Sequence, residues 1–102
     1  MPFVTATSIA DLPPGSAKLV ALNDRKIALF NVGGSLYALD DTCSHRGGPL
    51  SEGAVSGTEV TCPWHGARFD LASGNNLCPP ARNGVTSYKV QLVGNEVQVE
   101  VP

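Results

Sequence analysis

The sequence predicts an all-β fold, a small antiparallel β-sandwich, and composition and turn spacing carry this prediction. Of the 102 residues, 42% are hydrophobic and 16% are charged, which is too apolar a balance for a disordered chain. The 11 glycines and 8 prolines are too many turn formers for a helical bundle. Short apolar runs lie between these turns, several with the period of two that half-buried strands show. A chain of this length is expected to form a single domain, residues 1–102, around one core.

Four β-prone runs come before residue 40. They are Phe3–Thr7, Ser16–Leu22, Arg25–Val32 and Ser35–Leu39. A turn at Leu12–Gly15 separates the first two, because Pro13-Pro14 excludes both a helix and a central strand. Gly33-Gly34 suits a two-residue hairpin between the last two. This part of the chain therefore predicts a β meander.

The C-terminal segment predicts a β-hairpin. Its arms are Ser87–Leu92 and Glu96–Val101, and Gly94-Asn95 forms the turn between them. Apolar and polar residues alternate along both arms. The apolar positions are Tyr88, Val90, Leu92, Val97, Val99 and Val101. Such regular alternation predicts an antiparallel hairpin with one buried face.

Residues 40–81 form a loop-rich insert between these β regions. Gly, Pro, Ser and Asn are dense there, and only Glu59–Thr61 and Ala67–Leu71 resemble short strands. A compact domain rarely holds so long an irregular stretch unless something other than packing organises it. A bound metal would organise it.

Two boxes in this insert carry metal-binding residue types: Cys43-Ser44-His45 and Cys62-Pro63-Trp64-His65. Each supplies one thiolate and one imidazole, and a glycine soon after each histidine lets the backbone pass close to a bound group. Two thiolates and two imidazoles suit a tetrahedral zinc ion. They also suit a [2Fe-2S] cluster in which cysteines bind one iron and histidines the other. Ligand type alone leaves both open.

The spacing of the boxes distinguishes the two. The pattern C-x-H, sixteen residues, C-x-x-H lacks the C-x-x-C half and the spaced histidine pair of a usual two-Cys two-His zinc module. The boxes resemble those of the Rieske iron–sulfur family, with Gly47, Gly66, Phe69-Asp70 and Gly74 at the flanking positions. The resemblance extends to the meander, the Cys78-Pro79-Pro80 loop and the final hairpin. It implies a Rieske fold with two cluster-binding loops at one end.

Within that family, four positions separate the subgroups. Membrane-anchored Rieske subunits of cytochrome bc-type complexes carry an extra disulfide-forming cysteine in each box, where this chain has Gly48 and Trp64. Those subunits also place Ser and Tyr hydroxyls against the cluster and its ligand sulfur, where this chain aligns Ala67 and Phe69. These differences indicate the soluble Rieske-type ferredoxins of bacterial oxygenases.

The resemblance implies a cofactor, ligands and partners. One [2Fe-2S] cluster per chain is expected, with Cys43, His45, Cys62 and His65 as ligands. Each histidine would bind iron through Nδ1 and turn Nε2 toward solvent, where a partner docks. The expected role is one-electron transfer from a flavoprotein ferredoxin reductase to a terminal Rieske non-haem iron oxygenase of aromatic compounds. The chain is expected to be no enzyme by itself and to bind no small-molecule substrate.

Two alternatives stand beside this role. One is the small Rieske subunit of an assimilatory nitrite reductase, which shares the boxes. The other, from a different class, is a zinc-stapled interaction module. Iron and acid-labile sulfide separate the zinc module from the two Rieske proteins, and co-purification with a sirohaem enzyme separates the Rieske proteins from each other.

Several residues around the boxes have less specific interpretations. Cys78 is interpreted as structural, because the ligand set is complete without it. In the family, the loop corresponding to Pro79-Pro80 closes over the cluster, and shielding is the favoured role here. Trp64 is open between core packing and a partner contact, and Asp70 is expected to form a turn hydrogen bond. Charged residues beside the boxes are interpreted as solvated: Asp40, Asp41, Arg46, Glu52 and Arg68.

Charge and hydropathy exclude other function classes. The net charge is −2, with 7 basic and 9 acidic residues and no basic run, which argues against a nucleic-acid partner. Uninterrupted apolar stretches are far shorter than the ~20 residues that a membrane helix needs. Residues 1–17 contain no Lys or Arg and match no secretory signal, so a cytoplasmic location is expected.

Overall fold

The computed structural model describes residues 3–22, 25–41, 50–63, 68–75, 77 and 85–101. Within this part the secondary structure consists of β-strands and two short 3₁₀ helices, which confirms the predicted all-β class. The strands are β1 (Phe3–Ser8), β2 (Ala17–Leu22), β3 (Arg25–Val32), β4 (Ser35–Asp40), β5 (Ala54–Ser56), β6 (Glu59–Thr61), β7 (Arg68–Asp70), β8 (Ser87–Tyr88), β9 (Val90–Val93) and β10 (Glu96–Glu100). The 3₁₀ helices are η1 (Ile9–Asp11) and η2 (Leu50–Glu52). None of the described residues belongs to a helix long and apolar enough to cross a membrane.

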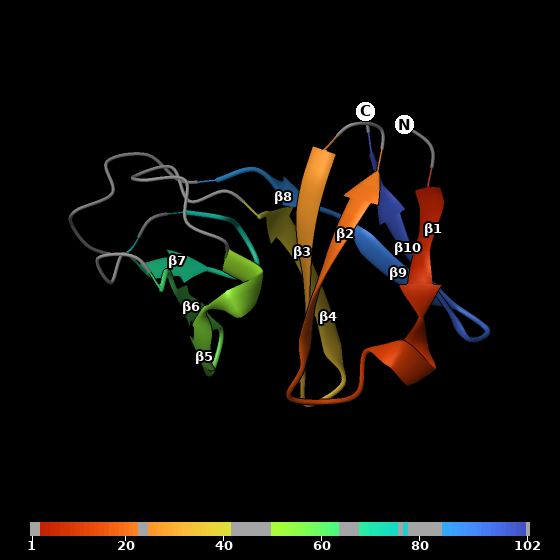
Figure 1. Ribbon diagram of the computed structural model, residues 1–102, viewed down its shortest axis with the longest axis horizontal. Helices are drawn as coiled ribbons and strands as arrows, with labels where there is room; N and C mark the ends of the chain where they lie inside the picture. The colour runs from red at the N-terminus through yellow and green to blue at the C-terminus, as the bar shows by residue number, and fades with distance from the viewer. Residues whose placement is uncertain are drawn as a thin grey trace.

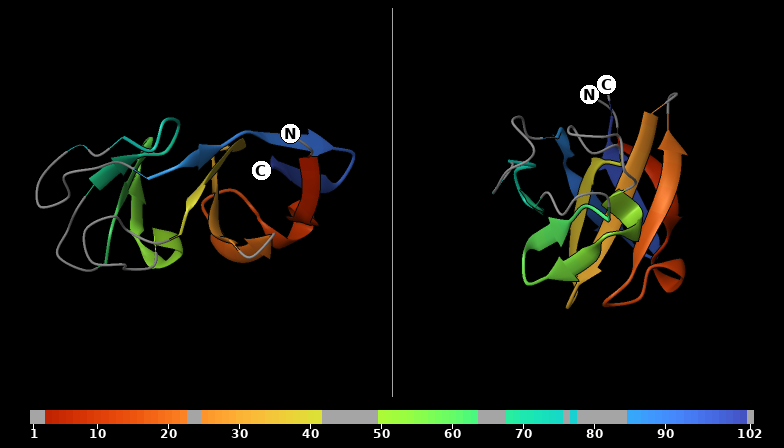
Figure 2. Two further views of the ribbon diagram at one scale, coloured as in Figure 1. Left: turned by 90° about the horizontal axis from the view of Figure 1, so that it is seen from above. Right: turned by 60° about the vertical axis from the view of Figure 1, so that its left-hand side comes forward.

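The strands form three antiparallel sheets. The central sheet has the order β2-β3-β4-β8, the terminal sheet β1-β10-β9, and the small sheet β5-β6-β7. Figure 1 shows the small sheet at one end of the molecule, away from both chain termini. The view from above in Figure 2 places the central sheet between the other two. The predicted antiparallel sandwich is therefore confirmed, with the small sheet added as a further layer.

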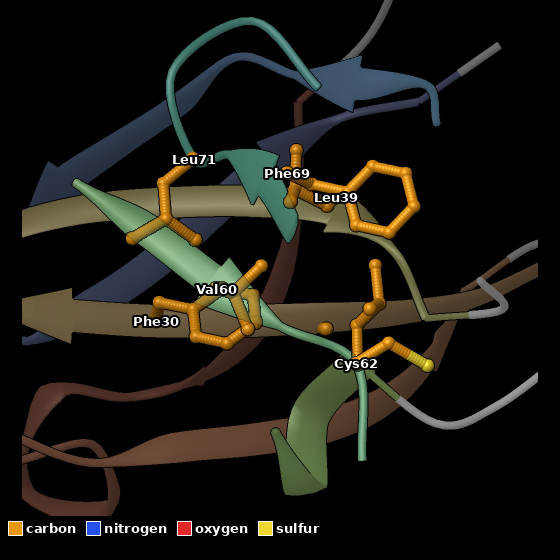
Figure 3. Close-up of a cluster of buried hydrophobic side chains, with 8 residues drawn as sticks. Phe30, Leu39, Val60, Cys62, Phe69 and Leu71 are labelled. Atoms are coloured by element: carbon orange, nitrogen blue, oxygen red, sulfur yellow. The ribbon is translucent and has the colours of Figure 1, made fainter. Parts of the chain in front are cut away.

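Both faces of the central sheet are buried. Alternate residues of β3 point to opposite faces, so Ile27 and Leu29 pack toward the terminal sheet while Ala28 and Phe30 pack toward the small sheet. The first face belongs to the terminal-side cluster: Leu12, Ile27, Leu29, Ala38, Val97, Val99 and Val101. The second belongs to the site-side cluster: Ala28, Phe30, Leu39, Leu50, Val60, Cys62, Phe69 and Leu71 (Figure 3). The core expected to be single is thus divided by the central sheet.

The last three of the four predicted runs form a meander, β2-β3-β4, whereas the prediction was wrong for the first run, because β1 pairs with β10 in the terminal sheet. β3 has the predicted bounds Arg25–Val32, and β1, β2 and β4 differ from the predicted runs by one residue each. In the β3–β4 pair, Val32 lies opposite Ser35, which leaves Gly33-Gly34 as the two-residue turn. The strand boundaries are therefore set by short turns such as Gly33-Gly34 and by the apolar runs between them.

The C-terminal prediction was wrong in one respect. The arm predicted as a single strand, Ser87–Leu92, is divided: β8 pairs with β4 in the central sheet, whereas β9 pairs with β10 in the terminal sheet. The chain thus passes from one layer to the next at Lys89. Leu92, predicted to be buried, is 51% exposed because β9 is an edge strand and Leu92 lies near its turn end.

The insert is more ordered than its composition suggests. β6 occurs at the predicted residues and β7 lies within the predicted Ala67–Leu71. No pattern along the chain indicated β5 or η2. Each is three residues long, and β5 is held by pairing with β6 rather than by a buried face of its own.

Candidate metal centre

Cys62 is the predicted ligand that falls among the described residues. It follows β6 directly, belongs to the site-side cluster and is only 1% exposed. Figure 3 shows its sulfur pointing away from Val60 and Phe30, toward the edge of that cluster. The predicted ligands Cys43, His45 and His65 lie outside the described residues. The predicted set of four is therefore represented here by this one thiol.

The described residues on either side of the first box are held together. The backbone N–H of Leu50 donates to the carbonyl oxygen of Asp41 over 2.6 Å, and the N–H of Ser51 donates to Asp41 Oδ1 over 2.8 Å. Asp41 is 4% exposed, so its interpretation as a solvated charge was wrong. Its carboxylate is buried because it satisfies the start of η2. The residues just before and just after residues 42–49 are therefore hydrogen-bonded to each other.

The second box is bracketed in the same way. Thr61 at the end of β6 lies opposite Arg68 at the start of β7, and the N–H of Leu77 donates to the carbonyl oxygen of Arg68 over 2.8 Å. The described ends around residues 64–67 and 78–84 thus meet at Arg68. The return from residues 78–84 is also fixed, since Thr86 accepts from the N–H of Asp40 over 2.9 Å.

Gly53 lets the residues that flank the first box lie close to those that flank the second. A Cβ placed on Gly53 would collide with the carbonyl oxygen of Thr61 and would lie 3.1 Å from that of Leu50. No side chain fits this gap, so glycine lets η2 approach the end of β6. The flanks of both predicted ligand boxes are thereby held against each other.

These observations fit an iron–sulfur group. A thiolate is a soft ligand that iron binds, and a metal compensates its charge in apolar surroundings such as those of Cys62. The flanks of both boxes converge beside that residue. Among the described residues, no three His, Cys, Asp or Glu side chains are grouped closely enough to hold a metal ion.

The charged residues beside the centre are partly paired. Arg68 Nη1 lies 3.5 Å from Glu59 Oε1, with both side chains largely exposed, as expected for a solvated pair. Glu52 is exposed as predicted. Asp70 Oδ2 accepts from both the N–H and the hydroxyl of Ser73, at 2.9 and 2.7 Å, which confirms its predicted role in a turn.

A second polar group lies where β4 meets β8. The Tyr88 hydroxyl donates to Asp40 Oδ1 over 2.5 Å, and Arg25 Nη1 lies 3.4 Å from the same hydroxyl. Burial raises the pKa of Tyr88 above its usual 10.0, and the hydrogen bond to Asp40 raises it further, while that from Arg25 lowers it. Sequence reasoning missed this group, because its members are distant along the chain.

Of the two residues that the resemblance aligns with the Ser and Tyr hydroxyls of cytochrome bc-type subunits, Phe69 is among the described residues. It is fully buried and belongs to the same cluster as Cys62. The other residues singled out near the boxes lie outside the described part of the chain: Arg46, Gly48, Trp64, Ala67, Cys78, Pro79 and Pro80.

The family model for the Rieske [2Fe-2S] domain matches residues 3–89. The 3-phenylpropionate/cinnamic acid dioxygenase ferredoxin subunit of Escherichia coli strain K12 is 40% identical over 100 residues, covering 97% of this chain and 93% of that protein. The ferredoxin of carbazole 1,9a-dioxygenase from Nocardioides aromaticivorans IC177 has a TM-score of 0.94 at 27% identity, and both chains are fully covered.

A third match is a chain from the complex of reduced oxygenase and oxidized ferredoxin in carbazole 1,9a-dioxygenase. It has a TM-score of 0.87 at 30% identity, with 95% of this chain and 91% of that chain covered. In both of these structures the similarity spans almost the whole of each chain.

Proposed function

The chain belongs to the Rieske [2Fe-2S] domain family, and from this premise we propose that it is a one-electron carrier of a multicomponent aromatic-ring oxygenase. Membership in this family brings one Rieske-type [2Fe-2S] cluster. The proposed ligands are Cys43, His45, Cys62 and His65. The buried thiol of Cys62, beside the converging flanks of both boxes, supports this ligand set.

The ligand set suits the carrier role. Two ferric ions, two sulfides, two thiolates and two neutral imidazoles sum to no net charge, so the cluster accepts one electron more readily than an all-thiolate cluster does. The chain's own residues hold the thiols and imidazoles, exclude water around Cys62 and fix the ends of the box segments. The chain is not itself an enzyme, as its relatives are ferredoxin components of dioxygenases.

The observation that carries the proposal is the end-to-end match to proteins named as ferredoxin components. One of the similar chains comes from a complex of a reduced oxygenase with an oxidized ferredoxin. We therefore propose that this chain delivers electrons to a terminal Rieske non-haem iron oxygenase and receives them from a flavoprotein reductase. A nitrite reductase small subunit is the weaker alternative, because a protein named as such a subunit matches in fold at only 23% identity, whereas the relatives at 40% identity are dioxygenase ferredoxin subunits. Membership in an iron–sulfur family argues against the zinc module.

The test is to measure metal content and electron transfer on the purified chain. Two irons and two acid-labile sulfides per chain are expected, with a spin-half signal after reduction by dithionite. The chain is expected to accelerate oxygenation only when a reductase and an oxygenase are both supplied. Stoichiometric zinc without sulfide would refute the cluster. A cluster-bearing chain that no reductase reduces would refute the carrier role.

A further inference from the structure

The polar group formed by Asp40 and Tyr88 joins two strands at a weak point of the central sheet. β8 is only two residues long and makes two register pairs with β4, Ala38 opposite Tyr88 and Leu39 opposite Ser87. Asp40 is two residues beyond Ala38, so it lies on the same face as Tyr88 and diagonally across from it. That geometry lets the Tyr88 hydroxyl reach Asp40 Oδ1 over 2.5 Å.

β4 and β8 each adjoin a segment of the proposed centre. β4 ends at Asp40, and the chain then enters residues 42–49, which contain the proposed ligands Cys43 and His45. β8 begins at Ser87, just after the chain returns from residues 78–84. The N–H of Asp40 also donates to the carbonyl oxygen of Thr86 over 2.9 Å. Asp40 therefore holds this return point through both its backbone and its side chain.

The hydrogen bond between Asp40 and Tyr88 lies outside both apolar clusters, although the Tyr88 ring packs against the terminal-side cluster. The two apolar clusters hold the three sheets together through residues buried at 0–1% exposure, and neither cluster contains Asp40. A carboxylate that accepts a hydroxyl hydrogen bond in a half-buried place makes a stronger contact than a neutral pair does. The hydrogen bond between Asp40 and Tyr88 therefore stabilises the pairing of β4 with β8 locally.

We infer that Asp40 and Tyr88 are positioning residues that hold the start of the first ligand segment against the return of residues 78–84. This inference rests on the proposed function, because it takes Cys43 and His45 as ligands. Breaking the pair would loosen the end of β4 from the start of β8, and water and chelators are then expected to reach the cluster more readily. The sheets themselves would remain folded.

The test uses the cluster-bearing protein and its Tyr88→Phe variant. Hydrogen exchange read by mass spectrometry is expected to be about tenfold faster in peptides covering residues 42–49 and 78–84, and unchanged in β1 and β10. Bleaching of the cluster by an iron chelator is expected to accelerate about tenfold as well. Tyr37→Phe is the matched control, since the described residues offer its hydroxyl no hydrogen-bond partner and it also lies on the central sheet.

Asp40 provides the independent arm of the test. Asp40→Ala should reproduce the effects of Tyr88→Phe. Asp40→Asn should retain much of the wild-type behaviour, because its amide oxygen still accepts a hydrogen bond. The double variant Asp40→Ala with Tyr88→Phe should be no worse than Asp40→Ala alone. Additive effects, faster exchange throughout the chain, or a Tyr88→Phe protein that behaves like Tyr37→Phe would overturn the inference. A wild-type chain that binds no cluster would instead refute the proposed function.

Discussion

Gly74 and Val85 cross with their backbones in contact. The N–H of Val85 donates to the carbonyl oxygen of Gly74 over 2.7 Å, and a Cβ placed on Gly74 would collide with the carbonyl oxygen of Val85. Gly74 is buried, has a φ of +80° and closes the turn after β7 by donating to Asp70. This crossing fixes Val85 across the turn that follows β7.

Replacing Gly74 by alanine is expected to destabilise the protein by about 2–4 kcal/mol. Part of this cost is the left-handed backbone, about 1–2 kcal/mol, and the rest is the collision of Cβ with backbone that has no room to move. Urea unfolding of the cluster-bearing protein measures it. Gly15→Ala is the control, since Gly15 has a φ of +85° but no atom within 4 Å of the position that a Cβ would take, so only the conformational cost of about 1–2 kcal/mol remains. Equal losses in the two variants would contradict the contact with Val85.

The sequence was sufficient for the strands that turn residues delimit. β3 occurs between the predicted residues because Gly33-Gly34 ends it and its apolar run begins at Ile27. The third layer was not predictable in the same way. β5 has three exposed residues and no periodic pattern, and it exists through its pairing with β6. The one sign of that layer was β3 itself, whose unbroken run Ile27–Phe30 indicates burial on both faces.

How well the sequence predicts the candidate centre depends on how far apart along the chain the contacting residues are. Cys62 could be proposed as a ligand because its box is a local pattern, and its burial is compatible with that proposed role. The burial of Asp41 was not predicted, because its hydrogen-bond donors are distant in the sequence. Its oxygens accept from the N–H groups of Leu50 and Ser51, which follow the whole first box. Asp40 and Tyr88 are 48 positions apart, and no local pattern joins residues at that separation.

The ligand assignment predicts which cysteine matters. Cys62→Ser, His45→Ala and His65→Ala are each expected to lose or alter the cluster, because each removes one proposed ligand. Cys78→Ser is the matched control and is expected to retain a full cluster. Iron and sulfide content together with the spectrum of the reduced protein measure both outcomes. Cluster loss in Cys78→Ser, or an unchanged spectrum in Cys62→Ser, would show that the ligands are misassigned.

The raised pKa of Tyr88 predicts a specific loss of stability at alkaline pH. Above pH 10.0, the usual pKa of tyrosine, the unfolded chain loses the Tyr88 proton while the folded chain still holds it. The stability that Tyr88 contributes is therefore complete below that pH and is lost as the pH rises through the folded value. The advantage of wild type over Tyr88→Phe in unfolding free energy should be constant below pH 10.0 and should shrink as the pH rises above that value in urea titrations. An advantage that stays constant or grows above that value would contradict this interpretation.

The residues aligned with tuning hydroxyls predict a low reduction potential. Hydrogen bonds to cluster or ligand sulfur stabilise the added negative charge of the reduced state. The Rieske subunits of cytochrome bc-type complexes place Ser and Tyr hydroxyls where this chain has Ala67 and Phe69. Without these donors, the potential is expected near −150 mV, the low end of the family range of roughly −150 to +300 mV. A low potential suits a donor that must give its electron to an oxygen-activating iron.

Restoring the hydroxyls should raise that potential. Phe69 is fully buried in the cluster that contains Cys62, so a hydroxyl added there by Phe69→Tyr is shielded from water and can act on the metal centre. A tenfold preference for the reduced state corresponds to about 59 mV, and Phe69→Tyr and Ala67→Ser are each expected to shift the midpoint upward by that order in protein-film voltammetry. Phe30→Tyr is the control, because it adds the same group to the same apolar cluster from β3, well apart from Phe69 (Figure 3). A shift in Phe30→Tyr as large as that in Phe69→Tyr would mean that polarity alone sets the potential. A wild-type potential well above zero would mean that these two positions do not set it.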